Sequence, residues 1–148
     1  MNKVALTTEL TESTEIVKDI NQLTELVIGC AIAVHRALGP GLLESAYEIC
    51  LCHELSLHNV PFECQKPLPL NYKGVKLDCG YRADQIVSGK VLMEIKYVDQ
   101  LLAIHEAQLL SYMRLGGFNV GLLVNFNERV LTHGIRRKVL GNPEEVSL

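Results

Sequence analysis

The chain lacks several features that would assign it to a class at once. No apolar stretch is long enough to cross a bilayer, and Met1 to Glu15 is polar and acidic without an apolar signal core. We therefore expect a cytoplasmic protein with no membrane contact. The absence of repeats, low-complexity tracts and linkers predicts a single domain over residues 1–148, with a flexible N-terminus (1–14) and a ragged C-terminus (141–148).

The cysteines are few and unpaired in sequence. There are five, an odd number, and none forms a CxxC pair, which argues against a zinc site. Cys50 and Cys52 lie two positions apart on an expected helix, so their side chains do not face each other. Because cysteine packs as a small apolar side chain, we expect buried free thiols.

Excess positive charge is also missing. The net charge is −3, whereas nucleic-acid binders are normally basic. Basic residues do gather in the central strand region and at Arg136-Arg137-Lys138, which would allow a local basic surface without demonstrating one. No Gly-Lys-Ser/Thr follows Gly39-Pro40-Gly41, so a phosphate-binding nucleotide loop is excluded.

The pattern of apolar residues predicts the order α-α-β-β-β-α-β, an α/β (α+β) domain whose helices pack on a sheet. Gly and Pro clusters mark the element ends. The strand over 62–70 contains two prolines and is expected at a sheet edge, whereas the apolar strand over 118–125 is expected to be buried on both faces. The expected elements are helices over 16–38, 42–57 and 103–115, strands over 62–70, 81–87, 90–97 and 118–125, and a strand or short helix after Glu128.

The most informative residues are three polar side chains in an expected β-hairpin. Glu94 and Lys96 are two apart on one strand and point to the same face, and Asp84 lies on the preceding strand. Carboxylate oxygens suit Mg²⁺, and a lysine beside them can position a water or stabilise charge. The pattern suits metal-assisted attack on a phosphodiester.

The hairpin register decides whether the two carboxylates can meet. A two-residue turn at Ser88-Gly89 would place Asp84 opposite Met93, on the other face from Glu94. A bulged turn with a left-handed Gly89 would place Asp84 across from Leu92, so that both acids share a face. A metal site therefore predicts a bulge or its equivalent at this turn.

A simpler interpretation stays open, since Glu94 and Lys96 could form a surface ion pair on a solvated strand. Against it, the flanking residues are apolar on both faces, and charge in a central strand is costly unless it is paired or metal-bound. Gln108 and Tyr112 share a helix face that could orient substrate or simply face solvent. His105 joins that face, but a lone histidine is more often structural.

Two glycines and a proline join the first two helices, and an acid and a tyrosine follow. Glu44 could favour the helix dipole or supply a further carboxylate, and Tyr47 suits the core. Gly39, Gly41, Glu44 and Tyr47 resemble the motif of the GxxExxY proteins, small bacterial proteins of the PD-(D/E)XK nuclease superfamily. The resemblance runs from about Ile28 to Asn127 and includes His35-Arg36, Tyr81-Arg82-Ala83-Asp84, His105-Glu106-Ala107-Gln108 and Asn125-Phe126-Asn127.

The resemblance implies a restriction-endonuclease-like core, a mixed central β-sheet flanked by helices. It also implies that Asp84 and Glu94 bind metal, that the backbone carbonyl of Ile95 assists and that Glu44 completes the site. Lys96 would be the signature lysine, and Gln108 and Tyr112 resemble the QxxxY pair of the superfamily's exonucleases. One departure is Ala83, which stands where the superfamily has proline before the aspartate.

We therefore expect a nuclease that depends on Mg²⁺ (or Mn²⁺) and hydrolyses phosphodiester bonds in DNA or RNA. The catalytic set would be Asp84, Glu94, Lys96, Glu44, Gln108 and Tyr112. The alternative is a non-catalytic nucleic-acid-binding or protein-assembly module on the same fold. The acidic net charge favours a partner protein for targeting, and the apolar helix over 16–38 is a candidate homodimer surface as well as a core element.

Overall fold

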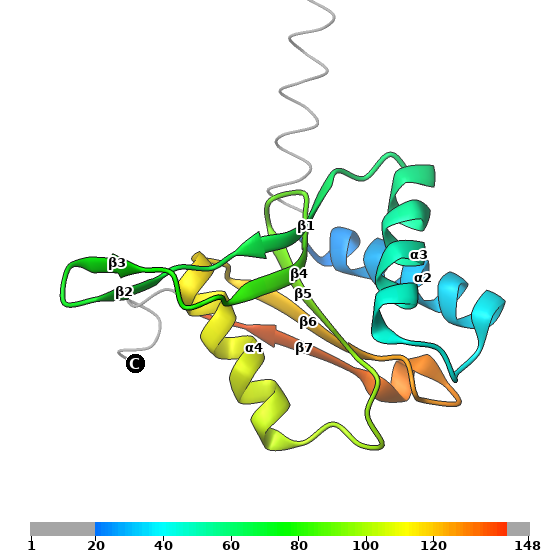
Figure 1. The fold of residues 1–148 in the computed structure, drawn as a ribbon. Helices are drawn as coiled ribbons and strands as arrows, with labels where there is room; N and C mark the ends of the chain where they lie inside the picture. Colours follow the sequence, from blue (N-terminus) through cyan, green and yellow to red (C-terminus); the bar gives the residue numbers. More distant parts are fainter. Residues whose placement is uncertain (1–19, 142–148) are drawn as a thin grey trace, which may run out of the picture.

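The computed structural model describes residues 20–141, which form a central sheet with helices on both faces (Figure 1). The expected flexible segment at 1–14, the first turn of the predicted helix at 16–19 and residues 142–148 lie outside the described range. The elements in order are α2 (Ile20–Leu38), α3 (Glu44–Leu57), β1 (Phe62–Pro67), β2 (Leu70–Tyr72), β3 (Val75–Leu77), β4 (Arg82–Val87), β5 (Val91–Lys96), α4 (Ala103–Gly116), β6 (Val120–Asn125), the 3₁₀ helix η1 (Leu131–Gly134) and β7 (Ile135–Val139).

The sheet is mixed, with strand order β1-β4-β5-β6-β7. Strands β5 and β6 are parallel and all other neighbours are antiparallel. A parallel pair needs a crossover, which α4 supplies between β5 and β6. As predicted, β1 lies at an edge, and every residue of β6 is buried. The strand that carries Glu94 and Lys96 is the central one.

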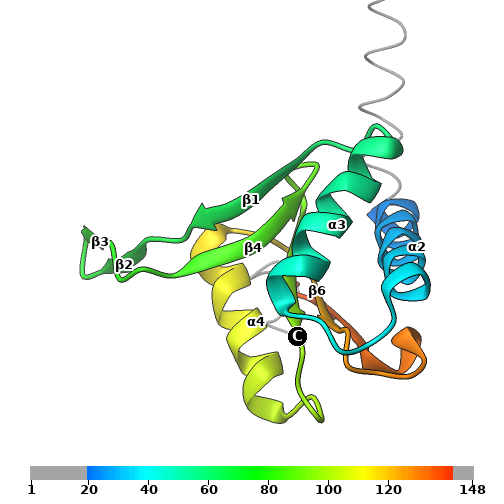
Figure 2. The ribbon, with the colours of Figure 1, turned by 45° about the vertical axis from the view of Figure 1, so that its right-hand side comes forward.

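Two apolar cores lie on opposite faces of the sheet. Helices α2 and α3 cover one face and α4 covers the other (Figures 1 and 2). Met93 and Ile95 of β5 pack in the core under α2 and α3, whereas Leu92 packs against Leu109 and Met113 of α4. Strand alternation therefore directs the even-numbered residues of β5 toward α4.

The small elements differ from the prediction. The single strand expected over 62–70 is divided, because the chain leaves the sheet after Pro67. Strands β2 and β3 then form a separate hairpin that projects from the main sheet (Figures 1 and 2). The segment after Glu128 contains both of the predicted alternatives, first η1 and then β7, which completes the sheet.

The expectation of buried thiols is wrong for most of the cysteines. Only Cys30 is buried; Cys50 and Cys52 are half-buried, and Cys64 and Cys79 are exposed. Cys64 is exposed because the middle of the edge strand β1 is uncovered. The cysteines of α3 lie beside the buried stripe of that helix and not within it.

The loop between α2 and α3 is closed by a buried tyrosine. Tyr47 donates a hydrogen bond to the carbonyl of Gly39 (2.6 Å) and accepts one from the backbone N–H of Leu42 (3.2 Å). Gly39 and Gly41 have positive φ angles (67° and 113°), which glycine adopts without a Cβ penalty. The Tyr47 ring is fully buried, so this loop is fixed to the core.

Two aromatic rings extend this contact toward the sheet. The Tyr47 ring stacks on Phe126 at a centroid distance of 4.5 Å and on Tyr97 at 5.9 Å. The start of α3 is thereby held against the chain that leaves β5 and β6. Within residues 20–141, no helix has both the length and the apolar character that a membrane span requires.

The Tyr47→Phe substitution tests this loop closure. It keeps the stacked ring but leaves the Gly39 carbonyl and the Leu42 N–H without their partner. We expect the free energy of unfolding to fall by about 1–3 kcal/mol, as measured by urea denaturation. Tyr72→Phe is the control, since Tyr72 is 58% exposed and should tolerate the loss of its hydroxyl. Equal stability of wild type and Tyr47→Phe would contradict the assignment.

Candidate active site

The turn between β4 and β5 differs from both predicted registers. Val87 pairs with Val91, so the loop has three residues, Ser88 to Lys90. Ser88 and Gly89 both have positive φ angles (52° and 64°), and the Lys90 N–H donates to the Val87 carbonyl. A left-handed serine is uncommon, which is why the sequence did not reveal this turn. The longer loop acts as the predicted equivalent of a bulge.

Further along β4 and β5, side-chain carboxylates accept hydrogen bonds from backbone N–H groups of the opposite strand. The ladder pairs include Gln85 with Met93, and one further step brings Asp84 directly opposite Glu94. Asp84 Oδ2 accepts from the Ile95 N–H (2.7 Å), and Glu94 Oε1 accepts from the Asp84 N–H (3.3 Å). The two acids therefore share a face, with each bonded to the backbone of the opposite strand.

This pair of acids carries an unfavourable concentration of negative charge. Glu94 is only 4% exposed, and burial together with the nearby Asp84 charge raises its pKa to about 8. Burial also raises the pKa of Asp84, although the Ile95 N–H and the Lys96 ammonium oppose that rise. The site therefore favours a proton, or another positive charge, between the two carboxylates.

A polar chain leads from the strand lysine to helix α4. Lys96 Nζ donates to Gln108 Oε1 (3.1 Å), and Gln108 Nε2 donates to the Tyr112 hydroxyl oxygen (3.0 Å). Burial raises the pKa of Tyr112, and the charges of Glu94 and Asp84 add to this rise. Tyr112 therefore keeps its proton at neutral pH. The structure thus joins three of the predicted residues on β5 and α4 by hydrogen bonds into one connected group.

Glu44 is part of this neighbourhood but is engaged by the backbone. Its Oε1 accepts from the Tyr97 N–H (3.1 Å), which fastens the start of α3 to the end of β5. Its charge still lies close enough to raise the pKa of Asp84. The residue thus has a structural contact and an electrostatic influence on the site.

Two residues that the sequence interpretation missed also reach the acids. Gln65 Nε2 donates to Glu48 Oε1 (2.7 Å) and lies 3.4 Å from Asp84 Oδ1. Burial raises the pKa of Glu48, and the charges of Asp84 and Glu44 raise it further. Glu48 follows Glu44 by one helical turn, a spacing that could have identified it. Gln65 gave no such signal, because its position depends on a positive φ (52°) within β1.

The donor chemistry of this site fits a hard divalent cation. Asp84 and Glu94 offer carboxylate oxygens, and burial together with the Asp84 charge raises the pKa of Glu94, so a positive charge at this position would be favourable. Within the described residues, no three His, Cys, Asp or Glu side chains converge as a complete metal cage. Mg²⁺ does not need one, since it is commonly held by one or two carboxylates together with waters and phosphates.

A groove of about 620 Å³ adjoins the polar chain on the α4 side. Gln108 and Tyr112 line it, and Tyr81 contributes an aromatic ring 5.7 Å from the Tyr112 ring. His105 also lies there, but its Nδ1 accepts from the Leu102 N–H (2.9 Å). His105 therefore closes the start of its own helix, in line with the structural role expected for a lone histidine.

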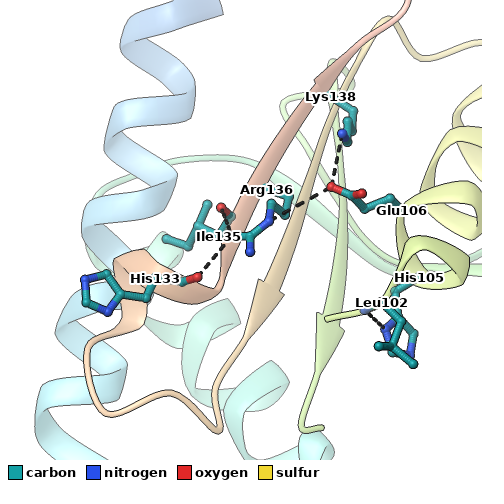
Figure 3. A network of polar contacts seen from close by, with 7 residues as sticks. All are labelled: Leu102, His105, Glu106, His133, Ile135, Arg136 and Lys138. Atoms are coloured by element: carbon teal, nitrogen blue, oxygen red, sulfur yellow. Dashed lines mark hydrogen bonds and ion pairs between the residues drawn. The ribbon is translucent and has the colours of Figure 1, made fainter. Parts of the chain in front are cut away.

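The basic triplet near the C-terminus does not form one surface. Lys138 Nζ lies 3.0 Å and Arg136 Nε 4.0 Å from the Glu106 carboxylate of α4 (Figure 3). Arg137 instead donates to Asn21 of α2, on the opposite face of the sheet. The three charges are thus divided between the two helical layers.

The raised pKa of Glu94 makes a pH-dependent stability prediction for the metal-free protein. The contribution of the Glu94 carboxyl to the free energy of unfolding is fully present below its ordinary pKa of 4.5. It is lost as the pH rises to about 8, the pKa in the folded protein. Glu94→Gln should therefore raise the melting temperature in EDTA at pH 8 by several degrees, with a gain that shrinks toward pH 5. Calorimetry measures the effect, and Glu63→Gln, an exposed glutamate on β1, is the control. A gain that does not depend on pH would refute the prediction.

Comparison with known proteins agrees with this geometry. A family model described as the PD-(D/E)XK nuclease superfamily matches residues 21–138, which include every strand acid and α4 residue described above. The chain matches none of the curated proteins and none of the solved structures with which it was compared. The five-stranded mixed sheet flanked by helices has the restriction-endonuclease-like architecture. The chain belongs to the PD-(D/E)XK nuclease superfamily.

Proposed function

We propose that this protein is a Mg²⁺-dependent nuclease, also served by Mn²⁺, that hydrolyses phosphodiester bonds in DNA or RNA. The observation that carries the proposal is the pairing of Asp84 with Glu94 across β4 and β5, beside Lys96. Superfamily membership supports it, because the match includes all three residues.

Asp84 and Glu94 would hold the cation, with Glu44 and the Ile95 carbonyl as further ligands. When bound, Mg²⁺ would supply Lewis-acid polarisation of the scissile phosphate and lower the pKa of the attacking water. The two carboxylates would balance the positive charge of the cation. Because each accepts a hydrogen bond from a backbone N–H group, they would keep their positions as substrate enters. Such fixed groups pay little reorganisation energy during the reaction.

Lys96 and Tyr112 would stabilise charge on the phosphate oxygens. The bond from Lys96 to Gln108 fixes the ammonium on the site side of α4. Tyr112 accepts from Gln108, so its own proton remains available for a phosphate oxygen. Its raised pKa keeps that proton in place at neutral pH. In this mechanism Gln108 orients both donors.

The groove beside α4 would accommodate the polynucleotide. Gln108 and Tyr112 line it, and Gln108 accepts a hydrogen bond from Lys96, so a chain lying in the groove would bring a phosphate close to Lys96. Tyr81 and Tyr112 offer aromatic surface for bases, which bind to such rings without regard to sequence. The proposed specificity is for the polymer backbone more than for a base sequence.

A non-catalytic binding or assembly module is the second candidate. It is favoured by the fact that Asp84, Glu94 and Glu44 each accept a backbone N–H, which gives these acids a structural role. The net charge of −3 favours a partner protein for targeting. The outer face of α2, where Leu26 is 38% exposed, is the candidate homodimer surface.

Cleavage assays test the nuclease. We expect the purified chain to cut at least one of single- or double-stranded DNA or RNA with Mg²⁺ or Mn²⁺, and not in EDTA. Glu94→Gln and Lys96→Ala should each lower the rate by roughly 100-fold or more. Lys90→Ala, in the turn of the same hairpin, is the control and should keep the wild-type rate. Wild-type cleavage by Lys96→Ala would refute the mechanism.

Metal binding is tested separately from activity. Titration calorimetry should show Mn²⁺ binding to the wild-type chain and at least a tenfold weaker affinity in Asp84→Asn and Glu94→Gln. Asp78→Asn, an exposed aspartate before β4, should bind like wild type. Nucleic-acid binding without metal binding or cleavage would support the non-catalytic module instead.

A further inference from the structure

Two cysteines that lie 12 residues apart in the sequence come into contact beside the candidate site. The sulfurs of Cys52 on α3 and Cys64 on β1 lie 2.7 Å apart, and both thiols are free. A disulfide bond is about 2.05 Å long, so only a small movement separates this contact from a covalent bond. The Cys50 thiol, also half-buried on α3, has a different direction on the helix.

The surroundings give the two thiols different reactivity. Cys64 is exposed on the edge strand, so a small molecule in solution can reach it. The Cys52 sulfur is half-buried and accepts a hydrogen bond from Gln85 Nε2 (3.3 Å). Burial and the neighbouring Cys64 raise the pKa of Cys52 to about 12. Cys64 is therefore suited to attack first and Cys52 to resolve the product.

We propose that Cys52 and Cys64 are a redox-modification site that forms a reversible disulfide by exchange with a low-molecular-weight disulfide. The Cys64 thiolate attacks one sulfur of that reagent, forms a mixed disulfide and expels one small thiolate. Cys52 then loses its proton to solvent and attacks the Cys64 sulfur, expelling the second thiolate. Two protein thiols are oxidised, and one small disulfide is reduced to two thiols, which take up the protons.

The cross-link would act on the candidate site through Gln65. That residue follows Cys64 and joins Glu48 of α3 to Asp84 of β4. A covalent bond between α3 and β1 would hold these two elements at their present separation. The proposal does not depend on nuclease activity, because bond formation is measured on the protein itself.

The test uses the reduced full-length chain and oxidised glutathione. After exchange, acid quenching and alkylation, two of the five thiols of the wild-type chain should be lost to an internal link, with no glutathione retained on Cys52 or Cys64. Trypsin cannot separate the two cysteines, because no Lys or Arg lies between Arg36 and Lys66. Glutamyl endopeptidase cuts after Glu54 and Glu63, so the oxidised sample should yield a linked pair of peptides that dithiothreitol separates.

Serine variants identify the bond. The variant with both Cys50→Ser and Cys79→Ser should still form the link, which assigns it to Cys52 and Cys64 within those peptides. Cys52→Ser should retain one glutathione on Cys64, since the resolving thiol is missing. The oxidised wild type should melt roughly 5 °C or more above its reduced form, because the link closes a short loop of the unfolded chain. Five free thiols after exchange, a stable mixed disulfide on Cys64 in wild type, or a link through Cys50 or Cys79 would overturn the proposal.

Discussion

The structure around the site depends on two backbone N–H groups that receive carboxylates as partners. Between Asp84 and Glu94 the ladder of β4 and β5 gives way to side-chain acceptors, so each strand supplies the acid that satisfies the other. A buried N–H without a partner is costly, and here the partner is a charge that is itself costly to bury. The hydrogen bond between them lowers both costs, which explains how Glu94 can lie in the central strand with 4% exposure.

This arrangement sets the electrostatics of everything around it. Glu48 reaches Gln65 on the side of α3, and Lys96 reaches Gln108 on the side of α4, so both helical layers are connected to the same pair of acids. Lys96 supplies positive charge that lowers the pKa of Glu94, but burial and the charge of Asp84 outweigh it and raise that pKa to about 8. A site with this balance accepts positive charge readily, whether as a proton or as a divalent cation.

Elements with a clear apolar period or a Gly or Pro boundary could be predicted, including α2, α3 and α4, the edge position of β1 and the burial of β6. The hairpin register could not be predicted, because it depends on a left-handed conformation of Ser88, which serine rarely adopts. Gln65 is hidden for the same reason. Glu48 could be predicted from helical spacing, because it follows Glu44 by one turn of α3. The expected burial of Cys64 was wrong. Cysteine is usually buried, but this one lies on the edge strand β1, where its position decides its exposure.

The acidic character of the chain becomes understandable in this light. Arg136 and Lys138 share the single carboxylate of Glu106, which offsets part of their charge and so reduces their attraction for a polyanion. The paired acids would repel a phosphate chain until a cation changes the local sign of charge. In the proposed nuclease, cation and nucleic acid should therefore bind with positive coupling, and thermodynamic linkage requires each to strengthen the other equally. A negative net charge then limits binding in the absence of metal and leaves Lys96 to act where the cation and the substrate meet.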